Sequence, residues 1–228
     1  MPERPVHELI KELSQVLVQL SDKVIGNLFN ALQAVKHQDA QGARQIRIVD
    51  GEIDVAEINL EERCLAFLAL QQPVARDLRT IVTIIKINDH LERIGDLAVH
   101  LIERMPEITP EMLEMFEFDN MGVQACEMVK HSIDAFVAAD RFLAGRITVT
   151  DEVIDAIHRK VFSRVASLMK SPDSDSNELI AALSISRYLE RIADHASSIA
   201  NEVVFLVTGE IVRHTEWSYE KLINSSRQ

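Results

Sequence analysis

The chain has 228 residues, with 24 Lys and Arg against 36 Asp and Glu, which gives a formal net charge of -12. Such a charge repels phosphate backbones and anionic lipids, so we expect no nucleic-acid partner. Only 7 Gly, 6 Pro and 5% aromatic residues accompany a large aliphatic share, which is typical of long helices. We therefore predict an all-α protein.

The first half of the chain predicts three long helices. Apolar residues recur at helical spacing over residues 6–37, 40–70 and 74–103. The third segment follows Pro73. Proline suits the first turn of a helix, because the backbone amides there have no helical hydrogen-bond partner and the missing N–H of proline costs nothing. This half forms a predicted three-helix bundle over residues 1–105.

The second half repeats this order of events after a proline-containing break. Helical spacing returns over residues 111–142, 150–170 and 177–208. Asp and Ser side chains in 171–176 are suited to cap the last helix, and Gly209 is suited to end it. We predict a second three-helix bundle over 110–209 and a polar tail over 210–228, so the expected architecture is six long helices in two tandem bundles.

The sequence also favours a cytoplasmic protein. Cys64 and Cys126 stand singly within apolar helical segments, where a thiol packs like a small hydrophobic residue in a reducing compartment. No apolar core of a signal peptide follows Met1, and no uncharged apolar run approaches the ~20 residues needed to span a bilayer.

The two halves share charged residues as well as apolar ones. Residues 91–98, LERIGDLA, align with residues 189–196, LERIADHA, at six of eight positions. The acids that open the second helix of each half correspond in the same way: Asp50 and Asp54 match Asp151 and Asp155. Core packing alone does not require repeated charges, so this internal repeat points to a shared chemical role.

The repeated acids form pairs on the third helix of each half. Glu92 and Asp96 are four residues apart, as are Glu190 and Asp194, so the members of each pair are neighbours on the helix surface. Each pair continues the line of an apolar stripe. Because apolar stripes face the core, we expect these carboxylates to point inward or into a groove.

The second helix of each half carries more acids on one face. These residues are Asp50, Asp54, Glu57 and Glu61 in the first half, and Asp151, Asp155 and His158 in the second half. Facing rows of carboxylates repel one another unless they are paired, protonated or bound to a metal ion, and we predict a metal ion. Oxygen ligands favour Mg, Ca, Mn or oxidised iron, whereas His158 or His195 would add a nitrogen ligand typical of zinc or iron.

Two other interpretations fit the same acids. They line solvated faces of a metal-free helical scaffold if arginines such as Arg93 and Arg187 neutralise them across helices. They belong to a carboxylate-bridged di-iron oxidase if histidines complete the site, but that class uses Glu-x-x-His. Only Asp155-x-x-His158 approaches this motif here, so we expect no enzymatic activity.

The doubled motif resembles the PhoU family of phosphate-regulatory proteins. The resemblance rests on LERIGD and LERIAD, on the Asp-x-x-x-Asp openings at Asp50 and Asp151, and on QPVARDLR at residues 72–79, and it covers nearly the whole chain except the tail. The chain departs from the family's pattern at Leu97, where a His is usual, and at His100 and Ser198, where Asn is frequent. The exact ligand set and equal occupancy of the two sites therefore do not follow from the resemblance.

The resemblance implies metal clusters, reported in relatives as iron or zinc, held by acids of two neighbouring helices. Carried over by position, the candidates are Asp50, Asp54, Glu92 and Asp96 in the first site, Asp151, Asp155, Glu190 and Asp194 in the second, and Glu57, Glu61, Asp89 and Glu202 as additions. The resemblance further implies a cytoplasmic homodimer without catalysis. Such proteins act as negative regulators that link the phosphate ABC transporter, through its ATPase subunit, to a sensor histidine kinase.

Overall fold

A computed structural model describes residues 5–212, and within that range it contains helices and no strand. The first half comprises α1 (Pro5–His37), α2 (Ala40–Gln71) and α3 (Ala75–Arg104). The second half comprises α4 (Pro110–Met115), α5 (Phe118–Ala138), α6 (Arg141–Leu168) and α7 (Ser176–Thr208), reached through the 3-10 turn η1 (Met105–Glu107). The predicted all-α fold is confirmed, and the tail from residue 213 onward lies outside the described residues.

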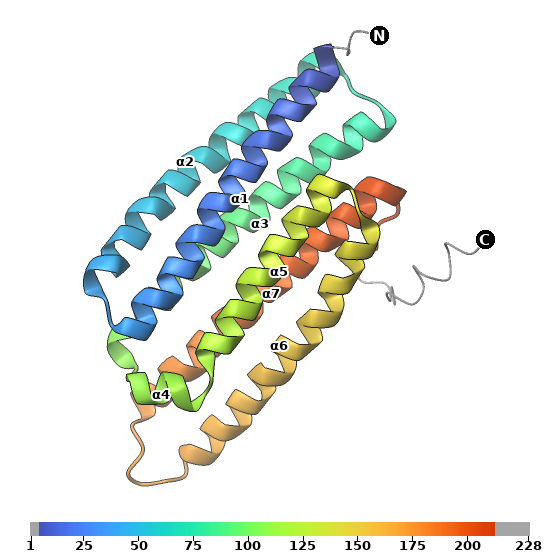
Figure 1. The fold of residues 1–228 in the computed structure, drawn as a ribbon. Coiled ribbons are helices and arrows are strands. Elements are labelled where there is room, and N and C mark those ends of the chain that lie inside the picture. Colours follow the sequence, from blue (N-terminus) through green and yellow to red (C-terminus); the bar gives the residue numbers. More distant parts are fainter. Residues whose placement is uncertain (1–4, 213–228) are drawn as a thin grey trace, which may run out of the picture.

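The helices are arranged as two bundles that share a central seam (Figure 1). Within the first half, α1, α2 and α3 contact one another, and within the second half α5, α6 and α7 do so. The halves meet where α3 packs against α7 and α1 against α5, while α2 and α6 lie on opposite flanks of the molecule. A single apolar core runs through both halves, with Leu91 and Leu189 fully buried at equivalent positions.

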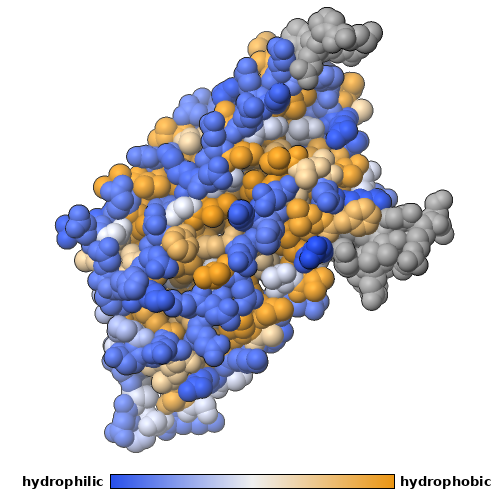
Figure 2. All heavy atoms as spheres, in the orientation of Figure 1, coloured by the Kyte–Doolittle hydropathy of each residue, from blue (hydrophilic) through white to orange (hydrophobic). Residues whose placement is uncertain are grey.

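One glycine lies at a close contact of the seam. A β-carbon added at Gly122 of α5 would lie 2.7 Å from a methyl carbon of Leu32 on α1, so the leucine side chain would have to move. On the visible face, polar side chains cover much of the surface and apolar ones emerge between them (Figure 2).

The same turn opens α2 and α6. Gln38 and Ala139 each adopt a left-handed conformation, and the aspartate that follows caps the next helix. The Asp39 carboxylate accepts a hydrogen bond from the Gln41 amide, and the Asp140 carboxylate accepts from two amides in the first turn of α6. These caps satisfy amides that have no helical partner.

The predicted boundaries are wrong in two places. The segment expected as one helix over 111–142 is divided into α4 and α5 at Glu117, whose φ of 54° ends helical geometry although no Gly or Pro marks the point. The following helix begins at Arg141 rather than near residue 150, because Asp140 caps it and Ala144 and Ile147 are buried in the core.

The other ends lie close to their predicted positions. Asp175 caps α7, and Gly209, at φ 81°, ends it with an amide that donates to the Phe205 carbonyl. Pro73 was expected in the first turn of α3, but it precedes the N-cap residue Val74 and stays outside the helix.

Candidate metal centre

Carboxylates of α2 and α3 gather in what we call the first cluster, namely Asp50, Asp54, Glu57, Glu61, Asp89, Glu92 and Asp96. At one end of it, partial burial raises the pKa of Asp50 to about 6, and the nearby charges of Asp54 and Asp96 add to the shift. The His100 side chain works in the opposite direction. This end therefore brings acids from two helices close enough to oppose one another's ionisation.

The other end of the first cluster is organised around Glu57. The Asn88 side chain on α3 donates to the Glu57 carboxylate at 2.8 Å and to its backbone carbonyl at 2.9 Å, which fixes α2 against α3. Partial burial followed by neighbouring carboxylates raises the pKa of both Glu57 and Glu92, and Asp89 contributes to each shift. Glu57 and Glu92 are half-buried, whereas Asp89 is exposed.

Gly95 lies directly beside Asp50 in the first cluster. A β-carbon at position 95 would lie 3.0 Å from Asp50 Oδ1. That oxygen is buried and has no hydrogen-bond partner within the described residues. An unpartnered buried carboxylate oxygen is costly in a folded protein, and a bound cation would remove that cost.

The second cluster, formed by Asp151, Asp155, His158, Glu190 and Asp194, repeats this arrangement between α6 and α7. Partial burial raises the pKa of Asp151 to about 6, opposed by the Ser197 hydroxyl and reinforced by Asp194 and Asp155. The pKa values of Glu190 and Asp194 are also raised, first by burial and then by neighbouring acids.

Histidine replaces glutamate at one position of the second cluster. His158 stands where Glu57 stands in the first half, and its Nδ1 atom lies 2.7 Å from Ser186 Oγ, just as Glu57 bonds to Asn88. Burial lowers the pKa of His158, and the charge of Arg187 lowers it further. A neutral imidazole at this position is a suitable nitrogen ligand.

Two candidate ligands are placed elsewhere. Glu202 is 3% exposed, and its carboxylate lies 2.9 Å from Lys86 Nζ on α3, so it pairs the two halves and does not join a cluster. The ring of His195 faces α3, with its Nδ1 atom 3.2 Å from that of His90. These two candidates contact the seam between the halves and not α6.

Among the described residues, the arginine–carboxylate ion pairs of the two clusters join residues of the same helix. Arg93 binds Asp89 four residues earlier at 3.2 Å, and Arg187 binds Glu190 three residues later at 2.6 Å. These two contacts do not supply the cross-helix ion pairs of the metal-free alternative. The sequence analysis did not identify Asn88 and Ser186 as partners of the cluster residues. Their equivalent positions in the repeat were the signal that could have indicated them.

The oxygen and nitrogen atoms of the clusters are of the types that bind metal ions, but they do not surround a single point. Among the described residues, no three His, Cys, Asp or Glu side chains are grouped so that they would hold an ion as they stand. The carboxylates nevertheless converge from two helices, and within residues 5–212 Asp50 Oδ1 and Glu190 Oε2 are buried without hydrogen-bond partners.

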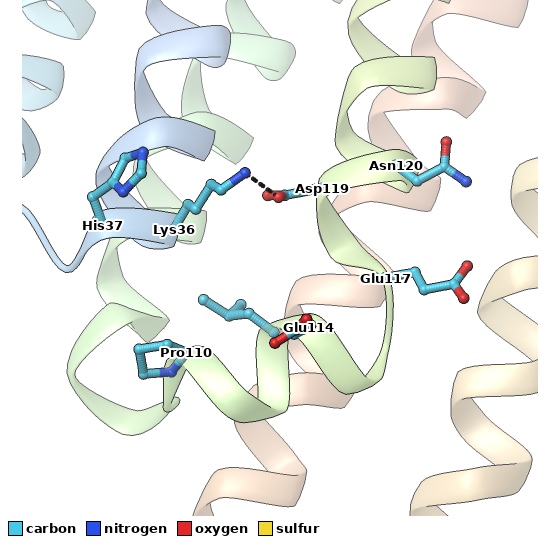
Figure 3. A pocket seen from close by; sticks show the side chains of 8 residues that line it. Lys36, His37, Pro110, Glu114, Glu117, Asp119 and Asn120 are labelled. Atoms are coloured by element: carbon cyan, nitrogen blue, oxygen red, sulfur yellow. Dashed lines mark ion pairs between the residues drawn. The ribbon is translucent and has the colours of Figure 1, made fainter.

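A separate pocket of about 500 Å³ lies where α1 ends near α4 and α5 (Figure 3). Lys36 and Asp119 form an ion pair across it, and Glu114 and Glu117 also line it. None of the predicted metal-site residues contributes to this pocket. Its mixture of charges indicates no particular ligand.

Comparison with known proteins agrees with the repeat. The PhoU domain model matches residues 17–105 and 118–203. The "Phosphate-specific transport system accessory protein PhoU homolog" of Clostridium acetobutylicum is 30% identical over 206 residues, which are 89% of this chain and 94% of the relative. This relative is described as an accessory protein, in agreement with the expected absence of catalysis.

Solved structures of PhoU share the fold. The PhoU crystal structure from Pseudomonas aeruginosa superposes with a TM-score of 0.81 at 30% identity, covering 90% of this chain and 99% of that one. The regulatory protein PhoU from Streptococcus pneumoniae gives a TM-score of 0.85 at 28% identity, covering 91% and 99%. No helix among the described residues is long and apolar enough to cross a membrane. The fold, the duplicated acids and these matches together show that the chain belongs to the PhoU family.

Proposed function

We propose that this chain is a metal-binding regulator of phosphate homeostasis. Its role is to restrain phosphate-starvation signalling and phosphate uptake. The observation that carries the proposal is the pair of carboxylate clusters in a chain whose relative is named as an accessory protein of the phosphate-specific transport system. A regulator of this kind needs binding surfaces and a stable scaffold and no reactive nucleophile.

The metal would be held between neighbouring helices. Asp50, Asp54, Glu92 and Asp96 would serve in the first half, with Asp151, Asp155, Glu190, Asp194 and His158 in the second. Multinuclear iron or zinc clusters are the proposed cofactors, and Mg, Mn or Ca are alternatives for an oxygen-rich site. A bound ion would neutralise carboxylates that now raise one another's pKa, and would thereby link α2 to α3 and α6 to α7.

The proposed partners are the ATPase subunit of a phosphate ABC transporter and a sensor histidine kinase. The chain would work as a cytoplasmic homodimer and would reach the membrane only through these partners. The net charge of -12 supports this arrangement, because an acidic surface is attracted to basic patches on partner proteins and repelled by anionic lipid.

Gene deletion tests the regulatory role. We expect phosphate-responsive transcription to stay high in phosphate-rich medium after deletion, and we expect the intact gene to restore repression. A gene carrying Glu92→Gln, Asp96→Asn, Glu190→Gln and Asp194→Asn should restore it less well. Unchanged transcription and unchanged phosphate uptake after deletion would refute the proposed role.

Chelation tests the metal separately from signalling. A ligand that binds the folded chain alone raises its stability, so EDTA should lower the melting temperature of the metal-loaded protein. The fourfold variant should melt at the same temperature with and without EDTA. If EDTA also leaves the melting temperature of the wild type unchanged after reloading and exhaustive dialysis, the proposed metal binding is wrong.

A further inference from the structure

The two clusters differ most at one aligned position. Residue 89 of α3 and residue 187 of α7 occupy the same place in the repeat, three residues before Glu92 and Glu190 respectively. Asp89 is an acid and Arg187 is a base, so the repeat reverses a charge there. Reversal of a single charge next to several carboxylates changes the local field strongly.

Asp89 makes the first cluster more acidic. Its charge contributes to the raised pKa of both Glu57 and Glu92. Its own positive partner, Arg93, has a counterpart at Arg191 in the second half. Arg187 is therefore an additional cation in the second cluster and not a relocated version of Arg93.

Arg187 acts on three members of the second cluster. Its guanidinium lies 2.6 Å from Glu190 Oε1, and its charge opposes the raised pKa of Glu190 and Asp194 and adds to the lowered pKa of His158. Its side chain is 55% exposed, whereas the Glu190 side chain is 12% exposed. The arginine thus approaches a buried carboxylate from the solvent side.

The second cluster also has fewer acids to attract an ion. Position 158 carries His where the first cluster has Glu57, and position 162 carries Phe where it has Glu61. Position by position, the seven carboxylates of the first cluster therefore correspond to four carboxylates, His158, Phe162 and Arg187 in the second, where Arg159 also pairs with Asp155 at 3.5 Å. The Glu190 residue as a whole is 9% exposed, and within the described residues its Oε2 atom is buried without a hydrogen-bond partner.

We propose that Arg187 is an internal cation that occupies the second cluster and must swing into solvent before a divalent metal ion binds there. Metal would then fill the first cluster at low concentration and the second only at higher concentration. This inference rests on the proposed metal binding. The swing is feasible because the Arg187–Glu190 pair joins nearby residues of one helix and is largely open to water on the arginine side.

Titration with Mn²⁺ tests the inference, with free Mn²⁺ followed by electron paramagnetic resonance. Glu92→Gln with Asp96→Asn would disable the first cluster and leave the second cluster to be measured alone. In that background, Arg187→Gln should lower the Kd for Mn²⁺ at least about tenfold, because a repelling charge and a competing cation are both removed. Arg187→Lys should bind as weakly as the parent.

A matched control separates this local effect from net charge. Arg164 is also exposed in the second half, but it lies over the ring of Phe116 and faces no cluster. Arg164→Gln should change the Kd less than about twofold, as expected for a distant, screened charge. Conversely, Asp89→Arg should weaken Mn²⁺ binding by the first cluster when Glu190→Gln and Asp194→Asn disable the second.

The outcomes are distinct. Equal affinity of the parent and Arg187→Gln, with both proteins folded by circular dichroism, overturns the role of Arg187 and leaves the proposed metal binding intact. A similar gain from Arg164→Gln also overturns it. If neither cluster binds Mn²⁺, zinc or iron in any variant, both this inference and the proposed metal site are refuted.

Discussion

Asp50 Oδ1 on α2 lies 3.0 Å from the place where a β-carbon at Gly95 on α3 would be, so the glycine and the aspartate fit against each other. The second half has Ala193 at the aligned position, which shows that the repeat tolerates a methyl group there. The pairing links helix packing to the position of a candidate ligand.

Gly95→Ala should separate stability from metal binding. Alanine favours the helix over glycine by about 1 kcal/mol, and displacement of Asp50 offsets part of this gain, so the free energy of unfolding should change by less than about 1 kcal/mol. The affinity of the first cluster for Mn²⁺ should fall, because Asp50 is moved. Urea denaturation and Mn²⁺ titration measure the two effects, and undiminished affinity would show that the methyl group does not displace Asp50 from the first cluster.

The metal-free protein should show an unusual pH dependence. Because the folded pKa values of Asp50 and Asp151 are raised from 3.8 to about 6, the folded state holds protons that the unfolded state has lost. Below about pH 4, protonation of these two groups therefore makes the fold more stable than it is at neutral pH. This contribution is lost as the pH rises to about 6.

Asp50→Asn and Asp151→Asn isolate that contribution. After allowance for partial solvent screening, each variant should be more stable than the wild type at pH 7 by on the order of 1 kcal/mol, with the difference vanishing near pH 4. Urea denaturation in EDTA across this range provides the measurement. A difference that is constant with pH, or that grows toward acid, contradicts the raised pKa values.

Glu202 should matter for stability and not for metal. Its carboxylate is buried against Lys86 across the seam between α3 and α7, so Glu202→Gln should destabilise the fold by about 1–3 kcal/mol. Replacing both partners by apolar residues, as in Lys86→Met with Glu202→Leu, should recover much of the loss. Mn²⁺ stoichiometry should stay the same in these variants, and a lost ion would return Glu202 to the ligand set.

The cap at Asp140 should hold the start of α6. Asp140→Ala removes an acceptor used by the Phe142 and Leu143 amides and should cost about 1–2 kcal/mol. Asp39→Ala, at the matching position before α2, should cost no more, because Asp39 accepts from one amide only. Hydrogen exchange of the first turn of α6 would locate the effect, and unchanged protection there would contradict it.

The α5–α6 boundary shows where sequence reading failed and what would have helped. The helix was expected to begin near residue 150, and residues 141–150 do contain Gly145 and several β-branched residues, which are poor helix formers. Burial of Ala144 and Ile147 overrides that weak preference. The repeat already held the answer, since Asp140 stands 101 residues after Asp39, the same separation that relates Asp151 to Asp50.

The candidate site was predictable to a similar extent. Helical spacing was enough to place Glu92 beside Asp96, and the duplication was enough to pair each helix with its counterpart. Spacing along one helix does not tell which neighbour a side chain faces, so His195 was expected near the second cluster and instead meets His90. The competition of Arg187 for Glu190 likewise depends on rotamers that the sequence does not specify.

Elemental analysis of the purified, tag-free protein tests the central claim most directly. The wild type should carry several metal ions per chain, and the folded variant with Glu92→Gln, Asp96→Asn, Glu190→Gln and Asp194→Asn should have lost them. Absence of metal from both proteins, even after reloading with iron, zinc or manganese, would contradict the account and leave a helical regulator whose acids serve ion pairs or partner contacts.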